Sequence, residues 1–244
     1  MKISLIVPTY KEDDNILELL TKIQSNLNKK NISYNVIIID DSPTNNIKNL
    51  LKDFNNNINY FFRGKKLGRG SAVLDGIKIA LKTEFVDMII EMDADLSHDP
   101  KELNTNIEKF FENKCDLLVA SRYKKESQIV GWPIMRKILS YFANKLAKLM
   151  LKIPVSDYTN GYRFYSKRSA ELISKNCGNI GDGFIVLSEI LLHIYSKNFK
   201  ICESSTFFKN RTKGHSSVNF KLIINSIIGL IKLYLIKEKL KKIN

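Results

Sequence analysis

The sequence has few cysteines, and their positions follow no recognisable pattern. Cys115, Cys177 and Cys202 are an odd number and lack the spacing of a metal site. They therefore predict no disulfide framework. Their small number fits a reducing compartment, in which each cysteine is a small core residue.

Long hydrophobic runs are also missing. No uninterrupted apolar stretch approaches the roughly 20 residues that a membrane-spanning helix needs. The apolar start of the chain, residues 1–8, is too short for a signal peptide and leads directly into a turn and a polar helix. We therefore expect a protein that stays on the cytoplasmic side and meets any membrane peripherally, without a transmembrane helix.

Acidic residues are outnumbered, with 39 Lys and Arg against 25 Asp and Glu in 244 residues, so the formal net charge is +14. Such an excess attracts nucleic acid, anionic lipid or phosphorylated substrates without choosing among them. A hydrophobic content of 44% and a charged content of 26% are typical of a globular domain and exclude disorder.

The first half of the chain alternates between apolar strands and amphipathic helices. Strands are expected at about 3–7, 36–39, 58–62, 86–92 and 116–120, and helices at about 14–27, 45–54, 71–81 and 101–111. Continuous apolar strands separated by such helices predict an α/β fold, with a Rossmann-like, mostly parallel sheet covered by helices on both faces.

The second half is richer in helix. Helices are expected at about 133–153, 185–195 and 218–239, with an extended segment at about 201–208. The first of these helices carries an apolar face opposite a row of lysines. We predict a catalytic domain over residues 1–217, followed over 218–244 by an amphipathic membrane-surface helix and a basic tail.

The clearest chemical signal is the pair of carboxylates Asp93 and Asp95, which follows the apolar strand 86–92. Side chains two residues apart share one face of an extended chain, and two crowded carboxylates repel unless a cation lies between them. Mg²⁺ or Mn²⁺ would suit these oxygens and would hold a diphosphate. The alternative is that both acids solvate a turn before the helix that starts near Pro100.

Three further turns follow predicted strands and point toward the same sheet edge. They are Pro8–Asn15, which offers an aromatic ring and carboxylates, Ile39–Pro43, which carries two acids, and the glycine-containing Leu67–Ala72 before a helix N-terminus. Taken alone, each of these segments contains residues that are common in turns and helix caps. At consecutive strand ends of an α/β sheet, they together predict a nucleotide pocket.

These motifs resemble those of the dolichol-phosphate mannose synthases of glycosyltransferase family 2. The similarity covers residues 3–217 in the family's order. The matching segments are Pro8–Glu12, Asp40–Pro43, Gly68–Ala72, Asp93–His98, Ser121–Tyr123, Gly131–Arg136, Ser140–Asn144, Asp157–Arg163 and Arg211–Ser216. The resemblance implies a GT-A fold, GDP-mannose as donor, dolichyl or another polyprenyl phosphate as acceptor, and inversion at the sugar carbon.

The resemblance also implies roles for individual residues. Asp93 and Asp95 would bind the metal, and Arg136 and Ser140 would grip the acceptor phosphate. Asp95, Arg122 and Arg211 would be catalytic. The nucleotide-sugar site would comprise Pro8, Tyr10, Glu12, Ile39, Asp40, Asp41, Gly68, Asp93, Ala94, Arg122 and Arg211. The residues themselves support the acceptor pair, because positions i and i+4 are neighbours on a helix and Arg matches phosphate oxygens.

This chain departs from the family pattern at two positions. Ser97 stands where some members carry Gln, which leaves a metal contact from this position open. Ser217 stands where the family has a lysine for the donor phosphate, and either Lys213 or Lys221 could replace it.

Other functions stay open at this stage. A polyprenyl-phosphate glucosyltransferase that uses UDP-glucose would need the same metal and acceptor chemistry. A nucleotidyltransferase would also place acidic metal ligands on an α/β sheet. A nucleic-acid-binding module would use the net charge, but the acids at the strand ends oppose it and no recognition motif is present. A small membrane-anchoring subunit stays open as a partner.

The three histidines, His98, His193 and His215, are scattered, and no Ser-His-Asp constellation is evident. His98 is a weak candidate for the metal site, and His193 is interpreted as structural. The segment 218–239 is expected to lie flat on a membrane. Its apolar face would be Phe220, Ile224, Ile227, Ile231 and Tyr234, and its headgroup face Lys221, Lys232 and Lys239. The alternative is that this apolar face packs on the catalytic domain or on a membrane partner.

Overall fold

The computed structural model describes residues 1–30, 32–52, 54, 57–83, 86–181, 183–211 and 220–243, with the backbone alone for 220–224 and 241–243. Within these residues a seven-stranded sheet has the order β3-β2-β1-β4-β7-β5-β8. Its strands are β1 (Lys2–Thr9), β2 (Ser33–Asp40), β3 (Ile58–Phe62), β4 (Met88–Glu91), β5 (Leu117–Ser121), β7 (Arg163–Ser166) and β8 (Ile201–Ser205). A second, two-stranded sheet pairs β6 (Gln128–Val130) with β9 (Phe207–Lys209).

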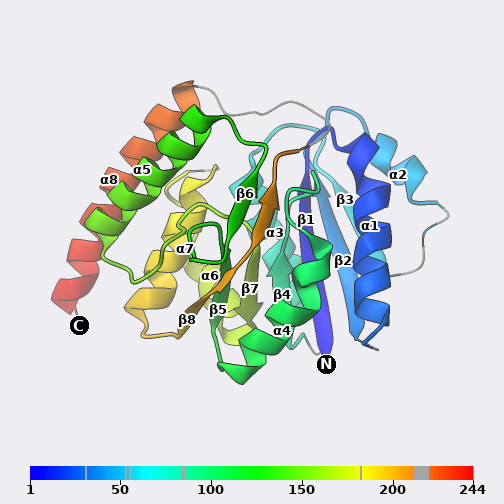
Figure 1. Cartoon of the computed structure of the whole chain (residues 1–244), viewed down its shortest axis with the longest axis horizontal. Helices are drawn as coiled ribbons and strands as arrows, with labels where there is room; N and C mark the ends of the chain where they lie inside the picture. The colour runs from blue at the N-terminus through cyan, green and yellow to red at the C-terminus, as the bar shows by residue number, and fades with distance from the viewer. Residues whose placement is uncertain are drawn as a thin grey trace.

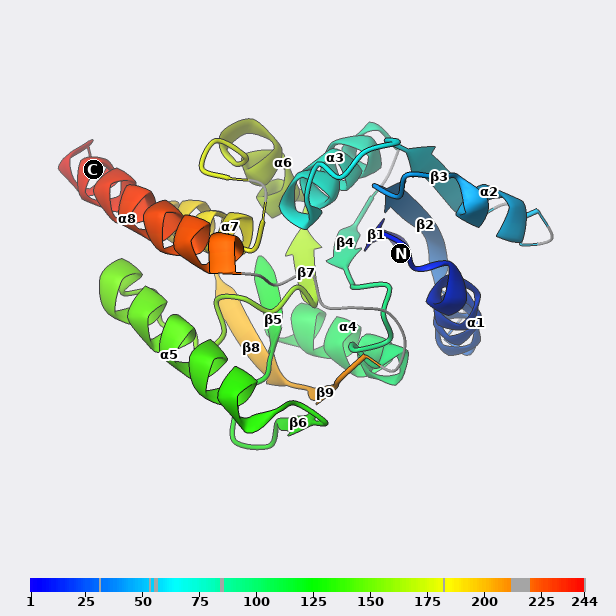
Figure 2. The ribbon, with the colours of Figure 1, turned by 90° about the horizontal axis from the view of Figure 1, so that it is seen from above.

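Helices cover both faces of the large sheet (Figures 1 and 2). On one face lie α3 (Arg69–Lys82), α6 (Lys167–Asn176) and α7 (Ile185–Ser196), and on the other α1 (Asp13–Asn28) and α4 (Leu103–Glu112). The remaining helices are α2 (Asn46–Leu50), a 3-10 turn (Pro100–Glu102), α5 (Ile134–Leu151) and α8 (Phe220–Ile243). Two buried apolar clusters, one on each side of the sheet, form the core.

The predicted α/β class with a mostly parallel sheet is confirmed. Strands β3, β2, β1 and β4 are mutually parallel, and β5 is parallel to β8. Their carboxyl ends therefore meet along one edge of the sheet, which is where open α/β sheets bind ligands. The motifs at the ends of β1, β2 and β4 all lie on this edge.

Strand β7 was not expected from the sequence. It is antiparallel to both β4 and β5, between which it lies. Its first residue, Arg163, is fully buried, and its guanidinium donates to the carbonyls of Asn160, Leu187 and Tyr158 at 2.9, 2.7 and 3.0 Å. A four-residue strand that opens with an arginine gives no apolar run, so periodicity alone does not predict it.

The expectation of unpaired cysteines is wrong for two of the three. Cys115 and Cys202 form a disulfide with a Cα–Cα distance of 6.0 Å, while Cys177 is free. Cys115 precedes β5 and Cys202 lies in the neighbouring strand β8. The two cysteines are 87 residues apart in the chain, so only the pairing of β5 with β8 shows that they can meet.

A thiol count tests this disulfide. We expect the denatured, unreduced protein to react with one equivalent of a thiol reagent at Cys177, and with three equivalents after reduction. The Cys177→Ser variant should then give no reaction before reduction. Three reactive thiols in the unreduced protein would contradict the pairing.

Helices α5 and α8 lie side by side on one flank (Figure 1). Leu230 and Leu233 of α8 are buried in the core cluster, and Lys237 donates to the carbonyl of Met150 at 2.7 Å. The predicted apolar face of α8 is exposed where the structure describes it, at Ile227, Ile231 and Tyr234; Phe220, Lys221 and Ile224 lie outside the described side chains. The division at residue 217 stays a prediction. Among the described helices, none is long and apolar enough to cross a membrane.

Candidate active site

The predicted metal ligands lie in a tight turn after β4. Leu96, between Asp95 and Ser97, has a left-handed φ of 60°, a conformation that costs a branched side chain energy and is concentrated at functional sites. Asp93 is paired with Arg69 at 2.6 Å, and Asp95 with Arg211 at 3.2 Å. Each carboxylate therefore faces a guanidinium group.

Arg69 joins this turn to the first turn of α3. Its guanidinium donates to Asp93 at 2.7 Å and to the fully buried Glu91 at 2.5 Å, and Glu91 also accepts from Tyr165 at 2.6 Å. Burial alone would raise the pKa of Asp93, but the positive charge of Arg69 holds this pKa below its usual value. Arg69 therefore keeps Asp93 ionised, a role that the sequence did not reveal.

His98 is fully buried and positions the turn. Its Nδ1 accepts from the backbone N–H of Asp93 at 3.1 Å, and its Nε2 lies 2.9 Å from Oδ1 of Asn160. The first bond requires an unprotonated Nδ1, so the proton is on Nε2 and points at Asn160. Both ring nitrogens are used, and the interpretation of His98 as a metal ligand loses its support.

The oxygen atoms around Asp95 fit a hard divalent cation. The Oγ of Ser97 is buried and has no hydrogen-bond partner among the described residues, while its backbone N–H donates to Asp95 at 3.1 Å. Two carboxylates and an unpartnered hydroxyl are donors of the kind that Mg²⁺ and Mn²⁺ prefer. In the described ranges, no group of three or more His, Cys, Asp or Glu side chains is arranged to hold a metal.

The end of β1 meets the acidic turn. The pKa of Glu12 is raised to about 7, mainly by burial and also by the charges of Asp95 and Asp93, while the hydrogen bond from Asn15 and the charge of Arg211 oppose the rise. Tyr10 is half-buried, and the ammonium of Lys66 lies 4.2 Å from its ring centroid. Pro8 is half-buried near the carboxyl end of β1, and the nucleoside contacts of Pro8, Tyr10 and Glu12 stay predictions.

The two acids after β2 are already bonded within the protein. Asp40 is fully buried next to buried Ile39, and its carboxylate accepts from Ser42 and from the hydroxyl of Tyr60 at 2.6 and 2.7 Å. Asp41 accepts from Arg63 at 2.6 Å and from the N–H groups of residues 67 and 68 at 2.9 Å. Asp41 therefore holds the glycine turn in place, and a direct contact of either acid with a nucleoside stays a prediction.

The glycine turn shapes the start of α3. Gly68 precedes the helix with a φ of 99°, which a residue with a side chain rarely adopts. A Cβ at Gly70 would lie 2.5 Å from Val186 and 2.7 Å from the carbonyl of Gly183. Gly70 is thus needed for the close packing of α3 on α7, and the part of this turn in a nucleotide pocket stays a prediction.

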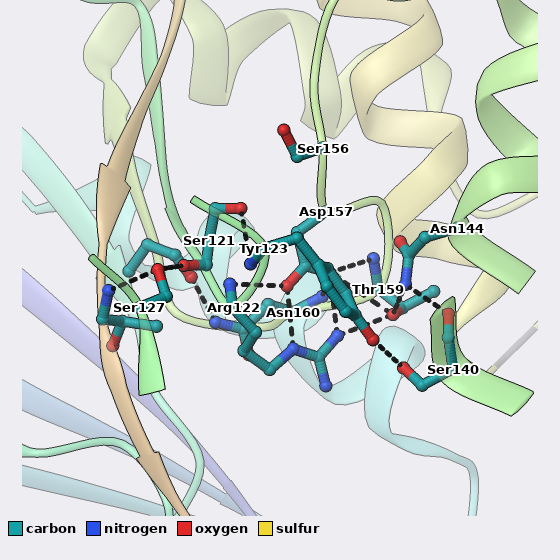
Figure 3. Close-up of polar contacts among 12 residues, drawn as sticks. Ser121, Arg122, Tyr123, Ser127, Ser140, Asn144, Ser156, Asp157, Thr159 and Asn160 are labelled. Carbon is teal, nitrogen blue, oxygen red and sulfur yellow. Dashed lines mark hydrogen bonds and ion pairs between the residues drawn. The ribbon is translucent and has the colours of Figure 1, made fainter. Parts of the chain in front are cut away.

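Arg122, after β5, is held by a buried network (Figure 3). It pairs with Asp157 through bonds of 2.8 Å from Nε and from Nη2, and Nη2 also donates to Thr159 at 2.7 Å. Burial alone would lower the pKa of Arg122, but Asp157 raises it above its usual value. Removing one partner of such a buried pair typically costs about 3–5 kcal/mol, so Arg122 also stabilises the fold.

The predicted acceptor pair lies on α5 next to this network. The hydroxyl of Tyr123 donates to Oγ of Ser140 at 2.7 Å, as Figure 3 shows. Arg136 donates to Oδ1 of Asn210 at 3.1 Å. Gly131 makes this contact possible, because its φ is 77° and a Cβ there would approach Asn210 to 3.1 Å.

Three arginines converge between the acidic turn and α5. Burial lowers the pKa of Arg136, and the charges of Arg211 and Arg122 lower it further, while Asp95 opposes them. The guanidinium groups of Arg122 and Arg136 lie 5.3 and 4.1 Å from the ring centroid of Trp132, and that of Arg211 lies 3.2 Å from Asp95. A cluster of this kind can bind two anions side by side, which is the arrangement that joins two phosphorylated substrates.

Trp132 is a residue of this site that the functional interpretation did not include. The Cζ atom of Arg136 lies 4.1 Å from the centroid of its ring. Trp132 belongs to the segment Gly131–Arg136, which resembles the family. That match was the one signal in the sequence that could have found it. The region of Lys213, Gly214, Ser216 and Ser217 falls outside the described residues, as does His215.

Comparison with known proteins identifies the family of this chain. The family model described as glycosyl transferase family 2 matches residues 4–173. A dolichol-phosphate mannosyltransferase of Pyrococcus furiosus is 30% identical over 237 residues, which are 96% of this chain and 64% of that protein. The chain thus spans just under two thirds of that relative's length. A polyprenol monophosphomannose synthase of Mycolicibacterium smegmatis is 26% identical over 88% of this chain and 80% of its own.

Solved structures give the same fold. Glucosyl-3-phosphoglycerate synthase of Mycobacterium tuberculosis, in complex with Mn²⁺ and UDP-glucose, has a TM-score of 0.66 at 16% sequence identity. The similarity covers 97% of this chain and 78% of that one. At this identity the comparison concerns the fold alone, and it confirms the predicted GT-A architecture.

Proposed function

Because this chain belongs to glycosyltransferase family 2, we propose that it transfers mannose from GDP-mannose to dolichyl or another polyprenyl phosphate. The chain is a glycosyltransferase similar to dolichol-phosphate mannosyltransferases. The observation that carries the choice of substrates is the cluster of Arg122, Arg136 and Arg211 beside the acidic turn. Such a cluster suits a diphosphate donor and a phosphate acceptor that must come together despite their charges.

The donor would bind along the carboxyl edge of the sheet. Tyr10 and Glu12 line the part of the edge that would receive the nucleoside, and Arg211 lies beside Asp95, where it would meet the diphosphate. Asp93 and Asp95 would hold Mg²⁺ or Mn²⁺, which neutralises charge on the leaving diphosphate when bound. The cation would take the place of Arg211 as the partner of Asp95 and so leave Arg211 available for phosphate, whereas Arg69 would stay bonded to Glu91.

The acceptor would bind at the start of α5. Arg136 would hold a phosphate oxygen, and Ser140, which accepts its hydrogen bond from Tyr123, keeps its own hydroxyl hydrogen to donate. A phosphate oxygen is already anionic near neutral pH, so its attack on the sugar carbon needs no general base. The new bond forms as the bond to GDP breaks, on the opposite side of the carbon, which inverts its configuration.

Calorimetric titration tests the donor half of this proposal. We expect GDP to bind more tightly than UDP, and EDTA to weaken the binding of GDP. The opposite preference would favour the polyprenyl-phosphate glucosyltransferase that the sequence left open. Release of pyrophosphate would identify a nucleotidyltransferase instead. We expect no binding of nucleic acid.

A membrane surface is the expected place of reaction, because the acceptor is a lipid. Large apolar side chains of α5 and α8 are exposed on one flank: Ile134, Met135, Ile138, Leu139, Phe142, Leu146, Leu149, Ile227, Ile228, Ile231 and Leu235. Lys145, Lys148 and Lys232 are exposed on the same two helices. Apolar and basic side chains on surface helices support peripheral binding to anionic lipid, with or without an anchoring subunit.

Vesicle sedimentation tests this surface. The variants Phe142→Glu and Leu149→Glu remove apolar side chains that are 59% and 71% exposed, so we expect several-fold weaker binding to anionic liposomes. The matched control Phe111→Glu, on α4 and 44% exposed, should bind as the wild type does. The α8 variant Ile231→Glu, at a position that is 50% exposed, should also weaken binding while GDP-mannose still binds; removing residues 218–244 would in addition take Leu230 and Leu233 out of the core. Wild-type protein that stays in the supernatant in low and high salt alike would contradict the proposal.

A further inference from the structure

Trp132 connects two of the arginines of the site. It is the single tryptophan of the chain and immediately precedes Pro133, the N-cap of α5. The Cζ atom of Arg136 lies 4.1 Å from its ring centroid and that of Arg122 lies 5.3 Å from it. The negative face of an indole attracts a guanidinium group, and the attraction is larger when both groups are desolvated. The ring therefore offsets part of the repulsion between the two cations.

The indole N–H is an unused donor. Trp132 is 7% exposed, and its Nε1 has no hydrogen-bond partner among the described residues. A buried donor without an acceptor is unfavourable, and an oxygen atom from a ligand would satisfy it. The ring that bears this N–H contacts Arg136, one of the two predicted acceptor residues.

Aromatic contacts extend from Trp132 to the acidic turn. Its ring meets Phe208 edge-on at 5.3 Å, and Phe208 meets His98 in the same way at 5.5 Å. His98 in turn accepts from the backbone N–H of Asp93. Packed rings of this kind resist displacement, so the position of Arg136 is fixed relative to Asp93 and Asp95.

From these contacts we propose that Trp132 is an acceptor-binding residue, which holds Arg136 beside Arg122 and donates its indole N–H to the acceptor phosphate. The inference rests on the proposed function, because it takes the second anion of the site to be a polyprenyl phosphate. Trp132 would be the third residue that binds the acceptor phosphate, after Arg136 and Ser140. This role explains why an indole ring is buried between two arginines.

Intrinsic fluorescence tests the inference without any transfer. Because the chain has one tryptophan, its emission reports on this site alone. Farnesyl phosphate, in the absence of nucleotide sugar, should change the emission saturably, whereas farnesol at the same concentrations should not. In Arg136→Ala the midpoint of the change should move to at least tenfold higher concentration. Unchanged emission on addition of farnesyl phosphate at concentrations that the protein demonstrably binds would overturn the inference.

Kinetics of two variants separate the roles of the ring and of the N–H. Trp132→Phe keeps an aromatic ring and removes the donor, so we expect the KM for farnesyl phosphate to rise about tenfold. Trp132→Leu removes both and should raise it further. In Trp132→Phe, which keeps a ring beside Arg122 and Arg136, kcat and the affinity for GDP should stay within about twofold of the wild type. An unchanged acceptor KM, or an equal loss of GDP affinity, would overturn the assignment.

These two experiments distinguish failure of this inference from failure of the proposed function. If the wild type transferred no mannose but its fluorescence responded to farnesyl phosphate, the proposed reaction would be wrong and the phosphate site at Trp132 would stand. If transfer occurred and neither the emission nor the acceptor KM depended on Trp132, the reaction would stand and this inference would fall.

Discussion

Replacing Asp95 with Asn is expected to lower kcat/KM for transfer by at least about 1000-fold, a loss of roughly 4 kcal/mol of transition-state stabilisation. The variant removes the charge that would hold the metal against the leaving diphosphate and keeps the size of the side chain. Asp95 is a better choice than Asp93, because Asp93 also neutralises Arg69 in a buried cluster with Glu91. Removing Asp93 would destabilise the protein as well as inactivate it.

Transfer rates at saturating Mn²⁺, together with thermal unfolding, measure the effect of Asp95→Asn. The matched control is Asp87→Asn, which changes the same residue type before β4, at the opposite end of the strand, where the side chain is 53% exposed. The control should keep nearly full activity. Wild-type rates for Asp95→Asn, or full activity of the wild type in excess EDTA, would contradict the metal assignment.

Replacing Arg136 with Ala is expected to raise the KM for polyprenyl phosphate about 100-fold while the affinity for GDP changes little. Arg136 donates to Asn210 and rests on Trp132, and neither contact reaches the residues that would bind the nucleoside. A charge-assisted hydrogen bond to phosphate contributes about 1.5–3 kcal/mol, which corresponds to this range of KM. The lost side chain is half-buried, so we expect only a small change in stability.

Initial rates at varied acceptor concentration and calorimetry with GDP measure the two effects of Arg136→Ala separately. Lys137→Ala is the matched control, because it removes a positive charge from the neighbouring, exposed position of α5. It should leave the acceptor KM within about twofold. Loss of GDP binding with an unchanged acceptor KM would mean that the donor and acceptor sites are exchanged.

The sequence predicted those parts of the fold that depend on local pattern. Apolar runs located β1 to β5, and the 3.6-residue period located the long helices. The parallel arrangement then put the turns after β1, β2 and β4 on one edge of the sheet. At this edge the charge of Asp95 raises the pKa of Glu12. Motifs at strand ends are therefore informative even before any contact is known.

Contacts between distant segments could not be predicted in this way. Arg69 was visible only as part of a glycine turn, yet it pairs with Glu91 and Asp93, which are more than 20 residues away. The nucleoside contact of Asp41 stays a prediction, and the sequence did not show that its carboxylate also holds the turn at residues 67 and 68. Polar residues that serve the fold and polar residues that serve a ligand have the same local pattern, and only their partners distinguish them.

The central claim is that this chain joins mannose to a lipid phosphate, and one transfer assay tests it most directly. The purified protein is incubated with radiolabelled GDP-mannose, Mn²⁺ and a polyprenyl phosphate, and the mixture is extracted with organic solvent; UDP-glucose replaces the donor in a parallel sample. The account predicts that label enters the organic phase from GDP-mannose, and only when both the metal and the lipid phosphate are present. Label that stays in the aqueous phase, or that enters the organic phase from UDP-glucose instead, would contradict it.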